Sequence, residues 1–75
     1  MELRRLETLR VVMSTLNMTA GAKQLHLSPA AVSLQIRQLS EELGTELFTH
    51  VGRHLLPSLA AQRLQQDLSP LMDAV

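Results

Sequence analysis

The chain has 75 residues, no cysteine and no apolar run near the ~18 residues of a membrane span, so we expect one small, soluble, intracellular domain without disulfides. Its apolar content of 45% with a single aromatic residue predicts an aliphatic core packed between helices. The seven basic and seven acidic residues cancel, but Thr8 to Ser40 contains only Arg10, Lys23 and Arg37 as charged residues, which predicts one positive face.

The N-terminal segment has the apolar periodicity of helices. The first predicted helix carries an apolar stripe at three- and four-residue spacing, made of Leu3, Leu6, Leu9, Met13 and Leu16. Asn17 is a good N-cap, and a short second helix is expected from Met18 to about Leu25. His26 and Leu27 leave room only for a tight connection.

The third predicted helix has clear signals at both ends. Ser28 caps it, and Pro29 occupies the first helical position, where the missing N–H has no cost. Gly44 ends it, as glycine does when a helix finishes in the left-handed conformation. The residues expected to face inward are Val32, Ile36, Leu39 and Leu43.

A hairpin and a fourth helix follow. The apolar pairs at 47–48 and 55–56 flank a polar, glycine-containing segment and predict two short strands with a basic turn. Pro57 ends the hairpin, and Ser58 caps a helix that runs toward the C-terminus. Pro70 should kink that helix, because it removes one backbone hydrogen bond.

Two short helices joined by a tight turn are the plan of a helix-turn-helix. Gly21 and Ala22 are small enough for a close crossing of the second and third helices, and His26 tolerates the positive φ that the turn requires. With Val32 and Ile36 buried, the opposite stripe of the third helix should face outward. Its short side chains suit the DNA major groove, which is about 12 Å wide.

These residues carry a family resemblance over essentially the whole chain. The opening MELRRLETLRVV, the stretch NMTAGAKQLHLSPAAVSLQIRQLSEELGTELF and the segment VGRHLLPSLAAQRL resemble the DNA-binding domain of LysR-type transcriptional regulators. The resemblance implies a mainly α, winged helix-turn-helix fold: a three-helix core, a β-hairpin wing and a long linker helix. It implies sequence-specific binding of double-stranded DNA in the regulation of transcription in the bacterial cytoplasm.

The resemblance also implies contact residues. Recognition would use residues 28–43 in the major groove, with the wing near the minor groove. The positions carried over as DNA-contacting are Thr19, Ser28, Pro29, Ala30, Ser33, Leu34, Gln35, Arg37, His50 and Arg53. The chain departs from the family where Leu34 replaces a polar or basic residue, where His50 replaces an arginine, and where Ala61 replaces a glycine. Recognition of the DNA bases should therefore depend on Ser33, Gln35, Arg37 and apolar contact with thymine methyl groups.

The C-terminal helix is expected to make a homodimer. Its seam has the 3.5-residue period of a coiled coil and consists of Ala61, Leu64, Leu68, Leu71 and Val75. We expect a DNA-binding domain at 1–57 and a linker or dimerisation helix at 58–75. A two-fold dimer predicts a spaced inverted repeat as the DNA site. The resemblance implies a small-molecule effector only through a C-terminal domain that these residues do not include.

The sequence favours DNA binding over other functions. No nucleophile, base and orienting group come together, so we expect no enzyme, no cofactor and no membrane partner. His50 and His54 lack a third metal ligand nearby, so no metal site is expected. A helical protein-interaction module is the main alternative, and Leu34 would suit such an interface as well as DNA. Stacking on RNA or single strands is disfavoured because Phe48 belongs to the expected core.

Overall fold

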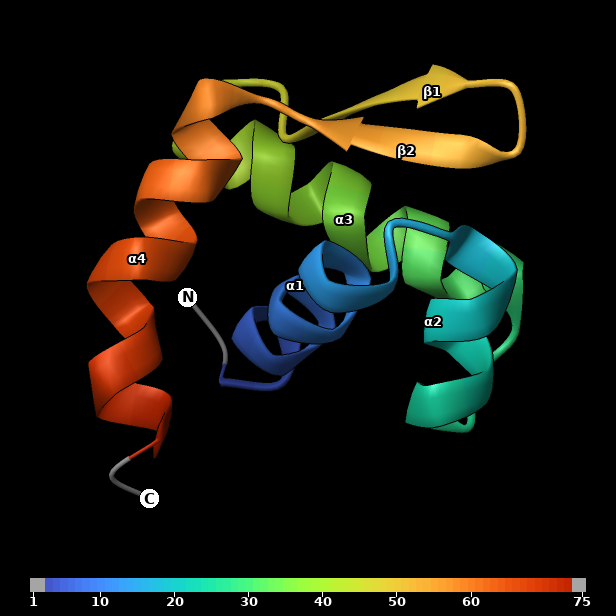
Figure 1. Ribbon diagram of the computed structural model, residues 1–75, viewed down its shortest axis with the longest axis horizontal. Helices are drawn as coiled ribbons and strands as arrows, with labels where there is room; N and C mark the ends of the chain where they lie inside the picture. The colour runs from blue at the N-terminus through green and yellow to red at the C-terminus, as the bar shows by residue number, and fades with distance from the viewer. Residues whose placement is uncertain (1–2, 74–75) are drawn as a thin grey trace.

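The computed structural model describes residues 3–73, with side chains through Asp67. The elements follow in the order α1 (Leu3–Thr15), α2 (Met18–Leu25), α3 (Pro29–Leu43), β1 (Phe48–Val51), β2 (His54–Pro57) and α4 (Leu59–Asp73). The three helices α1, α2 and α3 pack together, the hairpin lies along α3, and α4 forms the edge of the domain away from α2 (Figure 1). The predicted fold, mainly α with a hairpin wing, is confirmed.

The three predicted N-caps are also confirmed. Each side-chain oxygen accepts a hydrogen bond of 3.0–3.1 Å from the backbone N–H three residues later: Asn17 from Ala20, Ser28 from Ala31, and Ser58 from Ala61. Such a bond satisfies one of the N–H groups that the first turn of a helix leaves without a partner. The short polar residues before each helix therefore decide where the helices begin.

Left-handed residues end the helices. His26, with φ 57° and ψ 40°, stops α2, and its neighbour Leu27 donates from its backbone N–H to Ala22 O at 2.9 Å. Gly44, with φ 69°, stops α3 in the same way. Leu16 also has a positive φ, 50°, which the sequence did not predict, because leucine seldom adopts this conformation.

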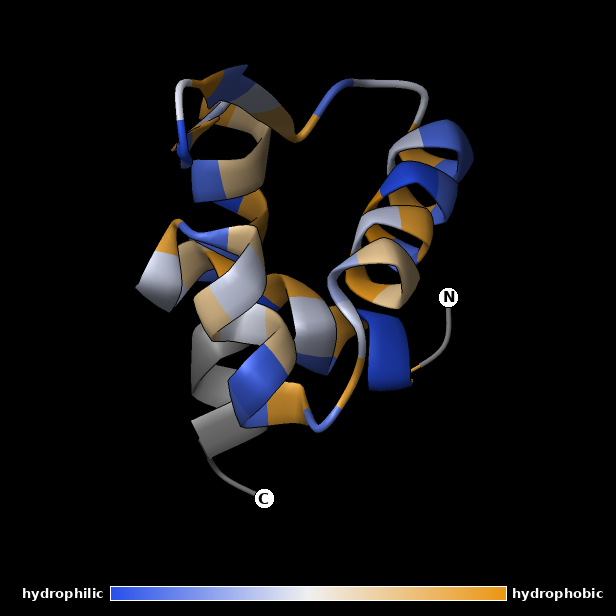
Figure 2. Cartoon of the chain, turned by 90° about the vertical axis from the view of Figure 1, so that its right-hand side faces the viewer, coloured by the Kyte–Doolittle hydropathy of each residue, from blue (hydrophilic) through white to orange (hydrophobic). Residues whose placement is uncertain are grey.

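The core is aliphatic and lies between the helices and the hairpin. Its buried apolar members are Leu9, Val12, Ala22, Val32, Ile36, Leu39, Leu47, Leu55 and Ala61. In Figure 2 the turn of the hairpin is hydrophilic, and apolar segments of the helices face the interior. The prediction that Leu43 faces inward was wrong, since Leu43 is 37% exposed in the last turn of α3. The predicted apolar stripe of α1 is not buried at its free end, where Leu3 is 69% exposed.

The close crossing at Gly21 involves a different helix from the one expected. A Cβ added to Gly21 would lie 3.2 Å from Thr15 Oγ1 and 3.5 Å from Val12 Cγ2, both on α1. Gly21 therefore lets α2 approach α1, whereas Ala22, 2% exposed, joins the common core. The prediction that both residues serve the crossing with α3 is corrected for Gly21.

The helix α4 packs on the domain through its first turns. Ala61 is fully buried, and Leu64 is half-buried against the same core. The prediction that Ala61 belongs to an exposed dimer seam is therefore wrong. The side chains of Leu68 and Leu71, and all of Val75, lie outside the described residues. The backbone of α4 remains helical through Pro70 as far as Asp73, so this proline does not end the helix.

Candidate nucleic-acid interface

The N-terminal half of α3 presents an exposed face of small side chains. Ser28, Pro29, Ala30, Ser33 and Arg37 are exposed, and Leu34 is 44% exposed. The opposite face of the helix is held by the buried Val32, Ile36 and Leu39, which fixes the orientation of the outward stripe. These six predicted residues share one accessible surface.

Gln35 does not belong to that surface. It is half-buried, and its side-chain oxygen lies 2.6 Å from the hydroxyl oxygen of Thr8, which is 1% exposed on α1. Thr8 Oγ1 also lies 3.1 Å from Arg4 O. The assignment of Gln35 to base readout is therefore corrected: its side chain joins α3 to α1.

The protons of this contact can be assigned by counting donors. A hydroxyl group has one hydrogen, so Thr8 cannot donate to Arg4 O and to Gln35 at once. Both contacts are satisfied when Thr8 donates to Arg4 O and the amide N–H of Gln35, turned by 180°, donates to Thr8 Oγ1. In this arrangement both polar groups of the buried contact have partners, so Gln35 has a structural role.

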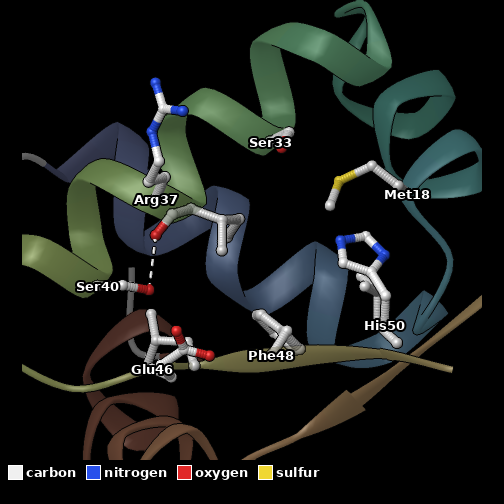
Figure 3. A pocket seen from close by; sticks show the side chains of 10 residues that line it. Met18, Ser33, Arg37, Ser40, Glu46, Phe48 and His50 are labelled. Carbon is white, nitrogen blue, oxygen red and sulfur yellow. Dashed lines mark hydrogen bonds between the residues drawn. The ribbon is translucent and has the colours of Figure 1, made fainter.

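A pocket of about 180 Å³ lies between α3 and the wing. Ser33 and Arg37 contribute to it from α3, and Met18 and His50 from α2 and β1. Figure 3 shows the Met18 and His50 side chains turned toward each other, while Arg37 extends away from the wing. Typical small-molecule sites have about 300–1,000 Å³, so this space is too small for such a ligand.

A second, more open groove runs between the start of α2 and the wing. Thr19 and Lys23, one helical turn apart on α2, line one side, and His50 and Arg53 line the other. All four side chains are exposed. Two cations and an imidazole therefore line this groove, with Lys23 in the last turn of α2 and Arg53 and His50 on the wing. The N-terminal end of α2 also borders it, and its backbone N–H groups favour an anion. The arrangement suits a phosphate group.

The tip of the wing presents Arg53. The hairpin register pairs Val51 with His54, which leaves Gly52 and Arg53 as a two-residue turn. Gly52 adopts φ 63°, the positive value that the first residue of such a turn requires. The tip is short and exposed, so the Arg53 side chain can extend beyond the body of the domain.

The two wing histidines cannot hold a metal ion together. His50 pairs with Leu55 and His54 with Val51, so they occupy neighbouring rungs and point to opposite faces of the ribbon. Among the described residues, no group of three or more His, Asp or Glu side chains is placed to bind a metal. Within the same part of the chain, no helix has the length and hydropathy that a bilayer span requires.

Acidic side chains mark the limit of the surface. Glu41 and Glu42 are exposed in the last turns of α3, and Glu42 forms an ion pair of 3.1 Å with Arg5 on α1. Glu46 lines the pocket beside Arg37. A polyanion would therefore be repelled from the C-terminal half of α3 and admitted only to its N-terminal half.

The structure thus brings nine of the ten predicted contact residues to accessible positions around α3, the start of α2 and the wing. The sequence predicts Lys23 only as one of three charges on a positive face and not as a contact residue, but it lines the groove with Arg53. Its position four residues after Thr19 on a helix was the signal that could have identified it.

Comparison with known proteins gives a consistent family match. Residues 3–62 match the family described as "Bacterial regulatory helix-turn-helix protein, lysR family". The regulatory protein NocR of Agrobacterium fabrum is 39% identical over 66 residues, which cover 88% of this chain and 22% of that protein. The chain spans 22–23% of the length of the first curated relatives that it matches.

Solved structures agree in fold. The DNA-binding domain of CbnR, in a crystal structure of its DNA complex, superimposes with a TM-score of 0.91 at 28% identity, over 99% of this chain and 85% of that one. The DNA-binding domain of BenM, in complex with catB site 1 DNA, gives a TM-score of 0.90 at 28% identity, over 99% and 80% of the two chains.

Proposed function

Because the chain belongs to the lysR family of bacterial regulatory helix-turn-helix proteins, we propose that it binds double-stranded DNA sequence-specifically and regulates transcription. The observation that carries this proposal is the exposed N-terminal half of α3, with small side chains at Ser28, Ala30 and Ser33. The wing residue His50 lines both the pocket beside α3 and the groove beside α2. The proposal gives the chain no catalytic role and places it in the bacterial cytoplasm.

In the proposed complex the N-terminal half of α3 enters the major groove. Ala30 allows a close approach, Leu34 contacts thymine methyl groups, and the Ser33 hydroxyl bonds to a base edge. Arg37, one turn farther along the helix, contacts a phosphate or guanine. The acidic Glu41 lies seven residues after Leu34, on the same exposed face, and keeps the C-terminal half of α3 outside the groove.

The groove beside α2 takes the phosphate backbone. The start of α2 and the side chains of Thr19, Lys23 and His50 form a positively polarised wall around one phosphate group. Arg53 at the wing tip reaches the adjacent minor groove, where a narrow A·T-rich segment attracts arginine. Phosphate contacts set the register, and α3 reads the sequence.

We further propose that two copies associate through α4. The described part of α4 is used by the chain's own core, since Ala61 is buried and Leu64 is half-buried. The proposed contact therefore lies in the later part of the seam, at Leu68, Leu71 and Val75. Residues 1–57 would form the DNA-binding unit and 58–75 the linker helix. An effector would act through a domain beyond these residues.

Selection from a random duplex library tests the function. The purified chain should enrich an inverted repeat, and its affinity for that duplex should fall steeply with salt because bound phosphates release counterions. A variant with Ser33→Glu and Arg37→Glu, two exposed positions outside the core, should keep its melting temperature and enrich nothing. Equal recovery of all sequences by the wild-type chain would remove the claim of specificity.

A further inference from the structure

The junction between α1 and α2 is tied to the wing by two hydrogen bonds. The backbone N–H of Leu55 donates to Leu16 O at 2.9 Å, and the side-chain Nδ2 of Asn17 donates to Arg53 O at 3.5 Å. Leu16 has φ 50°, a conformation that is costly for leucine and that turns its carbonyl group toward the wing. The junction thus contacts both the strand β2 and the turn of the hairpin.

Asn17 has two separate bonding partners. Its Oδ1 accepts from Ala20 N at 3.0 Å and caps α2, while its Nδ2 bonds to the wing. Serine, aspartate and asparagine cap helices about equally well, but only asparagine adds an amide donor. Several residue types could therefore cap α2, but the bond to the wing requires the amide group of asparagine.

The wing needs such a restraint. An isolated two-stranded hairpin is only marginally stable, and its outer face, which includes Val51 and Leu56, is exposed. The base of the ribbon is held by a hydrogen bond of 2.8 Å from Ser58 N to Leu47 O, and the part nearer the turn is held by buried Leu55. At the turn, Asn17 is the described residue whose side chain bonds to the backbone of Arg53.

From this geometry we infer that Asn17 is a positioning residue that orients the wing turn so that Arg53 faces the DNA. The inference rests on the proposed contact of the wing with DNA. Without the Nδ2 bond the turn samples more orientations, and binding must then restrict them, which lowers affinity. The same asparagine therefore links the helix that meets the phosphate backbone to the residue that meets the minor groove.

The test uses substitutions that keep the cap. Asn17→Ser and Asn17→Thr retain an oxygen acceptor for α2 and remove the amide donor, so the melting temperature should stay close to that of the wild type. Affinity for the selected duplex with A·T-rich flanks should fall about two- to threefold, the lower end of the range for one hydrogen bond, because the distance from Nδ2 to Arg53 O is 3.5 Å. With G·C-rich flanks the loss should be smaller, as it should be for Arg53→Ala.

A double-mutant cycle separates positioning from general stability. In an Arg53→Ala background, Asn17→Ser should cause no further loss of affinity, since the arginine that it positions is gone. An equal loss in both backgrounds, or no loss in either, would overturn the inference.

Amide hydrogen exchange in the free protein gives a readout that does not depend on DNA. Exchange at Arg53 and His54 should accelerate in Asn17→Ser while α1 and α3 remain unchanged. Unchanged exchange at the turn would contradict the inference even if the chain binds DNA. Faster exchange in a chain that binds no DNA would instead contradict the proposed function alone.

Discussion

Gln35 on α3 and Thr8 on α1 are joined across the domain by a polar contact of 2.6 Å, and Thr8 is almost completely buried. A buried polar group that loses its partner keeps the desolvation cost without the hydrogen bond. The pair therefore fixes the distance between α1 and the recognition helix as well as stabilising the core.

Removing one partner of this pair should destabilise the domain. Thr8→Val or Gln35→Leu alone should each cost about 1–3 kcal/mol in the free energy of unfolding. The double variant should cost less than the sum, because the second substitution removes a group whose partner in the pair is already absent. Chemical denaturation of the four proteins measures this, and additive losses would show that the two side chains act independently.

Gln35→Leu also tests whether Gln35 stabilises the core or contacts a DNA base. If Gln35 serves only the core, the base preferences of the variant should match those of the wild type wherever both are folded. A change of preference at one position of the half-site would return Gln35 to the DNA interface.

Gly21 should tolerate very little added volume. Gly21→Ala gains up to about 1 kcal/mol in helix propensity but brings a Cβ to 3.2 Å from Thr15 Oγ1. That oxygen lies 3.1 Å from Val11 O and 3.3 Å from Asn17 O and donates its one hydrogen to one of them, which restrains it, so the two effects should nearly cancel. Gly21→Val, with two more carbons, should lose about 1–3 kcal/mol.

The matched background for this experiment is Thr15→Ala. There the oxygen is absent, so Gly21→Ala should be stabilising relative to Thr15→Ala alone. Thermal unfolding of the single and double variants measures the effect of Gly21→Ala in each background. If Gly21→Ala has the same effect in both backgrounds, Thr15 is not the neighbour that limits the position.

Much of the fold could be predicted from local chemistry. Asn17, Ser28 and Ser58 were identified as caps because their side chains satisfy the first turn of a helix whatever the tertiary structure is. His26 was placed correctly because a turn with a positive φ selects few residue types. The starts of α2, α3 and α4 and the ends of α2 and α3 are therefore local properties that the sequence specifies, whereas the left-handed Leu16 after α1 was not predicted.

The contact partners were harder to predict. Gly21 was correctly identified as a close-packing residue, but whether it meets α1 or α3 depends on the tertiary arrangement. The spacing of Ala61 and Leu64 indicates an apolar stripe without saying whether the chain's own core or a second copy covers it. Gln35 could have been assigned correctly, since it lies three residues after Val32 and four before Leu39, on the inner side of α3.

Ser33 and Arg37 should contribute to DNA binding in different ways. Ser33→Ala should relax base preference at one position of each half-site, because it removes a bond to a base edge. Arg37→Ala, if its guanidinium contacts phosphate, should weaken all sequences about equally and reduce the salt dependence. Binding across a randomised site, with Glu41→Gln as a control on the same face, measures both. Identical profiles for wild type and Ser33→Ala would show that Ser33 reads no base.

Association through α4 should depend on concentration. Leu64 packs against the chain's own core, so its substitution would change the stability of the fold as well as the association of two copies. The double variant Leu68→Asp with Leu71→Asp should remain folded and sediment as a monomer, while the wild type dimerises, more strongly on an inverted repeat. A wild-type chain that stays monomeric at high concentration and occupies the repeat one copy at a time would contradict the dimer.

The placement of α3 in the major groove is tested most directly by cleavage from a tethered iron chelate. The chain contains no cysteine, so Leu34→Cys, at an exposed position, gives one attachment site. Glu41→Cys on the same face is the matched control. On the selected duplex, the chelate at position 34 should cut strongly within each half-site, and the chelate at position 41 should cut weakly. Equal, dispersed cleavage from both positions would contradict the account.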